Sequence, residues 1–480
     1  MRGTFSHKGV CSERARIALE ERYSHLLEET DEFDRQIVSF QANKTEILHS
    51  WIKYREGFSA NLIETLIEKF GLGPGDTILD PFAGSCTTML VAQMLGVNAV
   101  GIELLPHCHV AWQAKSRAFD YSLDELRYVR GLARKATLSA TGKKFPHVDI
   151  TRSAFPEQTE NDLMAYKHWI ETLDVSEETK ILCRLVLISI LEKISYTRKD
   201  GRFLRWDGRA QKMIERNARR VAQGKKPFKG IHKGELPSVQ KAFVEALSKI
   251  IVDVIRLQEN PPRESYQQLV DGNTLYVLPK MESDQFACVI TSPPYANRYD
   301  YTRTYALELA YLGVGKEIFD LRQDQLSCTV ENKPKLDELE AFYRSIDQHD
   351  RYIRIAEVAQ HNAALTEVNT ALQTRNELGE INNTGVLTMI AQYFTELTFV
   401  FAELCHVCQS GAHVVFVNDN VRYAGEVIPV DTLTTNLAEQ VGFEPVTIYV
   451  LPQRKGNSSQ QMARYGRTAL RKSITVWRKP

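Results

Sequence analysis

Two short segments that lie far apart in the chain combine residue types suited to binding and chemistry. One is 80–88, with the sequence DPFAGSCTT, and the other is 291–295, with the sequence TSPPY. An acid followed by a glycine-containing loop suits a strand end that turns toward a nucleotide-like ligand, because glycine allows close approach of the backbone. Two consecutive prolines fix the backbone and remove N–H donors, which leaves main-chain carbonyls free to accept hydrogen bonds.

The TSPPY segment follows an apolar run, 286–290, and could orient an amine for attack. The Ser292 hydroxyl and the Pro293 carbonyl are acceptors for an amino group, and the Tyr295 ring can stack on a planar base. An exocyclic amine shares its lone pair with its ring, so acceptors that draw on its protons favour a nitrogen that can attack a sulfonium methyl group. The turn contains no cysteine nucleophile for methyl transfer to carbon. The alternative interpretation is a proline-rich turn that merely ends a buried strand.

The elements predicted around the first segment form a β-α-β unit. A short apolar strand at 77–79 precedes the loop, a helix at 89–95 ends at Gly96, and a second strand at 97–103 ends in Glu103. Such a unit predicts a parallel sheet with right-handed crossovers. An acid at the end of the second strand is well placed to accept hydrogen bonds from ribose hydroxyls. The loop lacks the GxGxxG spacing of dinucleotide sites, and a generic Rossmann-like turn is the alternative.

Composition is that of a globular protein, with 43% hydrophobic and 25% charged residues. The 60 Lys and Arg balance the 60 Asp and Glu, which is unusual for a nucleic-acid-binding protein unless its basic residues are concentrated locally. The segment 198–233 is strongly basic, and aromatic residues interleave its charges: Phe203, Trp206 and Phe228. A charge run is usually a solvated face, but this interleaving favours a binding loop.

No uninterrupted apolar run has membrane-spanning length, and the N-terminus lacks the apolar core of a signal peptide. The eight cysteines are scattered, which indicates reduced thiols and a cytoplasmic location. Cys405 and Cys408 form a CxxC without a second half-site, so we expect helix packing there and no metal site.

DPFAGSCTT and TSPPY together resemble the AdoMet-dependent DNA amino methyltransferases, which methylate the exocyclic nitrogen of cytosine or adenine. The resemblance implies an α/β fold, namely a Rossmann-like methyltransferase sheet with a helical insert domain. It also implies base flipping, since the amino group must leave the duplex to react. It assigns catalysis to Ser292, Pro293, Pro294 and Tyr295. It assigns AdoMet binding to Asp80, Phe82, Gly84 and Glu103, with Phe58 and Ser59 at the methionine end and Asp271 at the adenine amino group.

The order of the two motifs is similar to the α arrangement of this family, in which the cofactor half comes first. The chain is expected to divide into a helical extension, an AdoMet-binding half, a partly basic helical insert for target recognition, and a catalytic half with a helical stretch at about 315–380. Their respective ranges are 1–45, 46–115, 116–265 and 266–480.

SPPY leans toward cytosine-N4 in the family, and we favour this base over adenine-N6. Two further hypotheses are an RNA amino methyltransferase and a non-catalytic DNA-binding subunit. One position departs from the family loop, because Cys86 stands where a second glycine is usual. A Cβ atom disfavours positive φ and could crowd the cofactor, which predicts weakened AdoMet affinity.

DNA is the expected partner, together with a cognate restriction or defence protein. Arg298 lies in a polar and aromatic segment, 297–303, that could hold the flipped nucleotide or could simply begin a helix. The further candidates for DNA contact come from the basic segment and from a polar loop near the C-terminus: Arg202, Arg205, Trp206 and Lys455.

Overall fold

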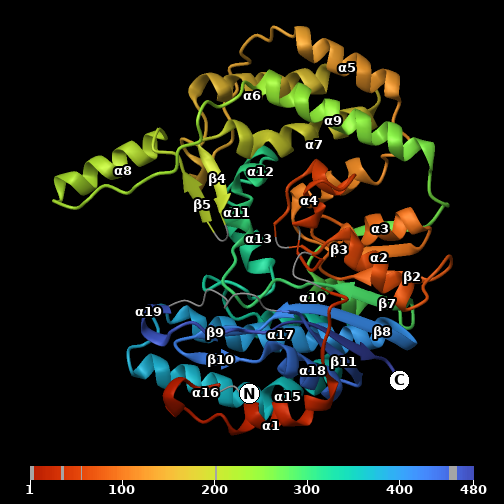
Figure 1. The fold of residues 1–480 in the computed structure, drawn as a ribbon, viewed down its shortest axis with the longest axis vertical. Helices are drawn as coiled ribbons and strands as arrows, with labels where there is room; N and C mark the ends of the chain where they lie inside the picture. Colours follow the sequence, from red (N-terminus) through yellow and green to blue (C-terminus); the bar gives the residue numbers. More distant parts are fainter. Residues whose placement is uncertain (1–4, 34–36, 40, 56, 201–202, 453–461) are drawn as a thin grey trace.

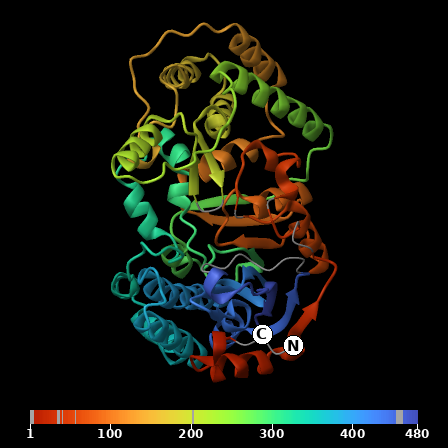
Figure 2. The same ribbon diagram turned by 60° about the vertical axis from the view of Figure 1, so that its left-hand side comes forward.

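The computed structural model describes residues 5–33, 37–39, 41–55, 57–200, 203–452 and 462–480. A large sheet in this part of the chain lies between two layers of helices (Figures 1 and 2). Its strands are, in spatial order, β1 (Leu27–Glu29), β11 (Glu444–Val450), β12 (Lys472–Arg478), β8 (Cys408–Asp419), β7 (Phe286–Thr291), β2 (Thr77–Asp80), β3 (Asn98–Glu103) and β6 (Gln267–Asp271).

Most neighbouring strands of this sheet are parallel. The run from β8 through β7, β2 and β3 to β6 is parallel throughout. Only β12 runs antiparallel, to β8 on one side and β11 on the other, and β1 pairs in parallel with β11. The predicted α/β class is confirmed, and the sheet is compatible with the Rossmann-like fold that the sequence motifs imply.

Both faces of the sheet are buried along its central strands, as the continuous apolar runs of these strands require. Alternate residues of β8 point to opposite faces: Val415 and Val417 belong to one core cluster, and Val414 and Phe416 to the other. Three helices from the first quarter of the chain cover the first face: α2 (Ala60–Lys69), α3 (Thr87–Leu95) and α4 (Pro106–Lys115). The second face is covered by α1 (Arg14–Arg22), α17 (Gly385–Val407), α18 (Val430–Gln440) and their neighbours.

The helices between β3 and β6 continue the first core cluster away from the sheet. They are α5 (Leu123–Lys135), α6 (Glu157–Thr172), α7 (Glu177–Ile194) and α9 (Val239–Glu259). An antiparallel hairpin and a projecting helix stand beside them (Figure 1): β4 (Thr197–Asp200), β5 (Phe203–Trp206) and α8 (Gln211–Ala222). Because the buried side chains of these helices form one contiguous cluster with those of α2–α4, this region is firmly joined to the sheet.

Short elements follow β6 and β7, and longer helices then lead to α17. The short helices are α10 (Thr274–Val277), α11 (Tyr301–Thr304) and α12 (Ala306–Tyr311). The stretch predicted to be helical contains α13 (Ile318–Asp324), α14 (Leu336–Ser345), α15 (His349–His361) and α16 (Ala363–Glu377). The remaining elements are a small hairpin and a short helix: β9 (Val421–Tyr423), β10 (Glu426–Ile428) and α19 (Met462–Tyr465).

By length and composition α17 could cross a membrane, but in this fold it packs beneath the sheet and is largely buried. Its Glu396 carboxylate accepts hydrogen bonds from the backbone N–H of Ser327 (2.8 Å) and from the Lys335 ammonium (3.1 Å). The same ammonium donates to the carbonyl of Gln325 at 2.5 Å. This buried ion pair therefore fastens the segment 325–327 to the core.

We predict that Lys335→Met destabilises the protein by about 3 kcal/mol, because Glu396 would stay buried without its counter-ion. The urea midpoint of unfolding measures the effect. Lys333→Met is the matched control, since that side chain is exposed. Equal midpoints for the two variants would contradict the anchoring role.

Candidate active site

The strand order reverses direction between β2 and β7, and the carboxyl ends of parallel strands at such a point form a crevice for ligands. The Asp80 carboxylate ends β2 and is 1% exposed. It accepts hydrogen bonds from the hydroxyls of Thr88 (2.7 Å) and Thr291 (2.8 Å) and from the N–H of Phe82 (3.1 Å). Burial raises the pKa of Asp80 to about 6, and these three donors oppose the rise. Asp80 thus joins the glycine loop and the TSPPY strand.

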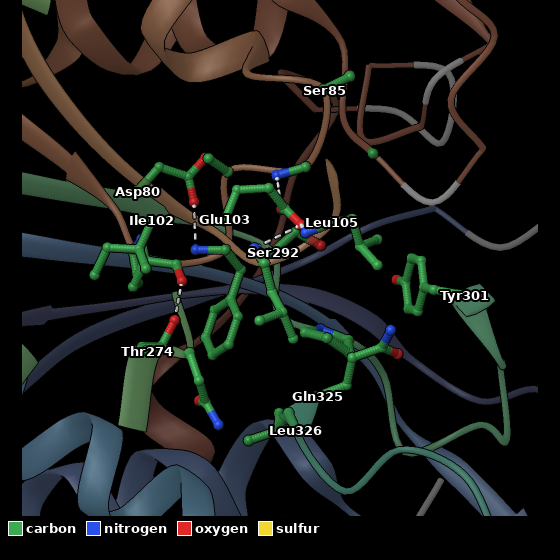
Figure 3. A pocket seen from close by; sticks show the side chains of 18 of the residues that line it. Asp80, Ser85, Ile102, Glu103, Leu105, Thr274, Ser292, Tyr301, Gln325 and Leu326 are labelled. Atoms are coloured by element: carbon green, nitrogen blue, oxygen red, sulfur yellow. Dashed lines mark hydrogen bonds between the residues drawn. The ribbon is translucent and has the colours of Figure 1, made fainter. Parts of the chain in front are cut away.

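A cavity of about 750 Å³, counting its open mouth, lies at these strand ends. Figure 3 shows Asp80 and Glu103 on one wall and Gln325 and Leu326 on the other. Both motifs contribute to the lining, because Ser292 and Pro294 belong to it. The predicted cofactor residues that line the cavity are Phe58, Asp80, Phe82, Gly84 and Glu103.

Two predicted cofactor residues lie outside this lining. Ser59 caps α2 by accepting a hydrogen bond from the N–H of Leu62 (3.3 Å), and it donates to the carbonyl of Ile37 (2.6 Å). The side chain of Asp271 is 81% exposed, 3.5 Å from Nε2 of His109. Its neighbours Gly272, Asn273 and Thr274 line the cavity instead.

The glycine loop approaches an aromatic side chain closely. Gly84 has φ +53°, and a Cβ atom there would lie 2.9 Å from Cε1 of Tyr54, so a side chain would collide with the cavity wall. Cys86 also has positive φ, 64°, which costs about 1 kcal/mol for a residue with a Cβ. Its thiol, however, is fully buried in the first core cluster and does not line the cavity. The steric crowding expected from the sequence is therefore absent from the lining.

Glu103 ends β3 with its carboxylate on the cavity wall. The carboxylate accepts hydrogen bonds from the N–H groups of Gly84 (2.7 Å), Leu105 (2.8 Å) and Leu104 (3.0 Å). Burial raises the pKa of Glu103 to about 7, although these backbone donors favour the ionised form. Oε1 accepts two of these hydrogen bonds and Oε2 accepts one, so Oε2 keeps a lone pair that can accept a hydrogen bond from a diol in the cavity.

Two side-chain amides in the described lining carry buried atoms without a hydrogen-bond partner. Among the residues that the structure describes, Nδ2 of Asn273 and both amide atoms of Gln325 are buried without a hydrogen bond. Gln325 is only 7% exposed, and its backbone is fixed by Lys335. Because an unsatisfied buried polar group costs about 1–3 kcal/mol, these amides indicate a polar ligand that supplies both acceptors and a donor.

A second, wider cavity of about 1340 Å³, open to solvent, adjoins the first. Ser292 and Tyr301 line both cavities, whereas Pro293 and Tyr295 line only the second. The Ser292 hydroxyl donates to the Tyr295 hydroxyl at 3.2 Å. Four cationic side chains complete the second lining: Lys44, Lys53, Arg55 and Lys472. The second cavity therefore combines an aromatic ring with positive charge, which suits a base and its phosphate.

The residues predicted to contact DNA are spread over different places. Arg205 is exposed and forms an ion pair with Asp200. Nζ of Lys212 lies 3.8 Å from the centroid of the Trp206 ring. Arg298 has φ 68° and is half-buried just after the TSPPY turn. Arg202 and Lys455 lie outside the described residues.

Sequence reasoning missed Tyr54, Asn273, Gln325 and Lys472 in these linings. Asn273 lies two residues after Asp271, which was expected at the adenine amino group, and this closeness was a usable signal. Gln325 lies in a stretch that was recognised only as helical, and nothing local marks it.

Comparison with known proteins identifies the family of this chain. A family model described as DNA methylase matches residues 20–113. The chain is 54% identical over 479 residues to the type II methyltransferase M.BsoBI of Geobacillus stearothermophilus, covering 99% of this chain and 94% of that protein. It is 39% identical over 473 residues to the type II methyltransferase M.AvaI of Anabaena variabilis, covering 96% and 93%. The chain belongs to this family of type II DNA methyltransferases.

The methyl donor of this family is AdoMet, and the residues of the first cavity fit it. Glu103 would accept hydrogen bonds from the ribose hydroxyls, and the amides of Asn273 and Gln325 would bind polar groups of the adenine or methionine ends. AdoMet supplies a methyl group on a sulfonium, so no metal is needed to activate the leaving group. The predicted family and cofactor are thus confirmed.

We predict that Gln325→Leu raises the Kd for AdoMet about fivefold, since one net hydrogen bond contributes about 1 kcal/mol. Calorimetric titration without DNA measures it. Gln323→Leu is the control, because Gln323 is outside the lining and its amide is already bonded to Glu331 and Lys333. Equal Kd values for both variants would contradict a ligand contact at Gln325.

We predict that AdoMet affinity falls as the pH is lowered through about 7, the raised pKa of Glu103. The ionised carboxylate is the better acceptor for ribose hydroxyls, and a proton must compete with the ligand below this pKa. The loss should reach about tenfold from one unit above the pKa to one unit below. Glu103→Gln should bind weakly with little of this pH dependence, and an unchanged pH profile in that variant would assign the titration elsewhere.

Proposed function

We propose that the enzyme transfers a methyl group from AdoMet to the exocyclic N4 of cytosine at a specific DNA sequence, with the cytosine flipped out of the duplex. One observation carries the proposal: Ser292 stands on the wall that the AdoMet cavity shares with the wider, cationic cavity. A methyl donor in the first cavity and a base in the second would therefore meet at the TSPPY turn.

Each residue of the turn has a role in this proposal. Tyr295 stacks on the flipped base, and Lys472, whose Nζ lies 5.4 Å from the Tyr295 ring centroid, contributes positive charge for the phosphate of that nucleotide. The Ser292 hydroxyl turns from Tyr295 to accept a hydrogen bond from the amino group, and the carbonyl of Pro293 accepts a second. These acceptors place the nitrogen lone pair toward the AdoMet cavity. Pro293 and Pro294 keep the turn rigid, because their ring closure fixes φ.

The choice of base rests on the sequence of the turn, since SPPY leans toward cytosine among the DNA amino methyltransferases. Adenine-N6 is the second candidate, because it too presents an amino group beside a ring nitrogen. We further propose that residues 116–265 recognise the target sequence, that a cognate restriction endonuclease is the biological partner, and that the enzyme works in the cytoplasm.

The direct test is to incubate the protein with labelled AdoMet and unmethylated DNA, with RNA in parallel, and to identify the methylated nucleosides by mass. N4-methylcytosine from DNA supports the proposal. N6-methyladenine would transfer the same mechanism to the other base. No methylated nucleoside from DNA would contradict the proposed activity.

We predict that Tyr295→Ala lowers kcat/KM for DNA about 100-fold, because stacking on an aromatic ring contributes about 1–3 kcal/mol per base. The Kd for AdoMet should stay within about twofold, since Tyr295 lines only the second cavity. Tyr295→Phe keeps the ring and removes the hydroxyl partner of Ser292, so it should retain most activity. If the Phe variant is as inactive as the Ala variant, the hydroxyl of Tyr295 and not its ring is required for activity.

A further inference from the structure

A basic arm projects from the helical region. It consists of α8 and the loop that follows, residues 211–229, and it stands clear of the body in Figure 1. Met213, near the start of α8, is the one buried side chain of that helix in the described structure. With a rise of 1.5 Å per residue, α8 is about 18 Å long, which matches about five base pairs of duplex DNA.

The arm concentrates positive charge, although the chain as a whole has no net charge. It contains seven Lys and Arg and a single acid, Glu215, whereas the whole chain has 60 of each sign. The basic side chains are Lys212, Arg216, Arg219, Arg220, Lys225, Lys226 and Lys229. In the described part of the chain, none of the seven pairs with a carboxylate, and the outer ones are exposed. Their charge is therefore available to a polyanion.

The arm is braced internally, so the path of its loop along α8 is fixed. Asn217 exchanges two hydrogen bonds with the backbone of Phe228, of 2.8 and 3.1 Å. The guanidinium groups of Arg216 and Arg220 lie 4.1 and 4.0 Å from the centroid of the Phe228 ring. Nε of Arg220 also donates to the carbonyl of Lys226 at 2.9 Å. These contacts fold the loop back along α8 and order both parts before any ligand binds.

The two sides of α8 differ. Lys212, Arg216 and Arg219 recur at helical spacing on one side, while Ile214 and Val221 are 51% and 59% exposed on the other. The basic side matches a phosphate backbone, and the apolar side offers no charge to it.

The base of the arm is tied to the reaction site. Lys199 of β4 forms a buried ion pair with Glu308 of α12, and its Nζ lies 4.3 Å from the ring centroid of Tyr305. Strand β5 packs against α11, whose first residue, Tyr301, lines both cavities. A duplex whose target base enters the second cavity would therefore have a fixed relation to the arm.

We propose that the basic side of α8 and the lysines of the loop that follows it lie along the phosphates of duplex DNA outside the target sequence and add affinity without sequence preference. This rests on the proposed action on duplex DNA. Because phosphate contacts release counterions, each lost contact should lower the salt dependence of binding by about 0.9 in the log–log slope.

The test compares wild type with an Arg219→Ala, Lys225→Ala, Lys226→Ala variant on two duplexes centred on the target sequence, which sequencing of methylated plasmid identifies first. One duplex ends about two base pairs beyond that sequence and the other about ten, enough to underlie the arm. On the long duplex the variant should show a KM about tenfold higher, an unchanged kcat and a salt slope lower by about 2–3. On the short duplex it should match wild type.

The control variant, Ile214→Ser with Val221→Ser, changes the apolar side and should match wild type on both duplexes. If the basic variant has a higher KM on both duplexes, the arm contacts the target sequence itself. If its KM is unchanged on both, the arm does not contact DNA. A loss confined to the control would assign the arm to another partner. Each of these results overturns the proposal.

Hydroxyl-radical footprinting of the wild-type complex adds a measurement that depends on no variant. Protection should extend about five base pairs beyond the target sequence, and protection confined to the target would overturn the proposal. If the wild-type protein methylates neither duplex, the proposed function is refuted. If only the proposal about the arm is wrong, the wild-type protein still methylates both duplexes.

Discussion

The buried carboxylate of Asp80 holds the two chemistry-bearing strands together at the point where the strand order reverses. It receives the hydroxyl of Thr291 from β7, the hydroxyl of Thr88 from α3 and the N–H of Phe82 from its own loop. Hydrogen bonds to a charged group contribute about 1.5–3 kcal/mol each, and here they offset the burial of the charge. The position of TSPPY relative to the glycine loop, and hence of one cavity relative to the other, depends on this side chain.

Three other contacts complete the first cavity, which we propose binds AdoMet, and each comes from a different part of the chain. Gly84 permits the close approach of Tyr54, Glu103 is oriented by three backbone donors, and the Lys335–Glu396 pair fixes the backbone of Gln325. The cavity wall opposite the strand ends is therefore formed by the helical stretch that follows the TSPPY turn. Ser292 is left between a cavity suited to the cofactor and a cavity suited to a nucleotide.

The elements around the motifs could be predicted because their apolar runs are sharply bounded. Strands β2, β3 and β7 lie where the sequence places them, and α3 ends at Gly96, whose φ is 71°. Strand β1 was missed because it is only three residues long and two of them are glutamates, so its place depends on pairing with β11. Hairpin β4–β5 was hidden within a segment recognised only by its charge.

The site could be predicted to the extent that its residues follow strand ends. Asp80, Glu103 and Ser292 do so, and all three line the first cavity. Ser59 and Asp271 are close in sequence to residues that line this cavity, but Ser59 caps α2 and Asp271 faces solvent. Gln325 has no local signal, since a tertiary ion pair brings it to the cavity.

A structure of the complex with S-adenosylhomocysteine and a duplex carrying the target sequence would test the central claim most directly. The account predicts a flipped base stacked on Tyr295 in the second cavity, with its amino nitrogen within hydrogen-bonding distance of Oγ of Ser292. A base bound elsewhere, or an amino group directed away from Ser292 and the AdoMet cavity, would contradict it.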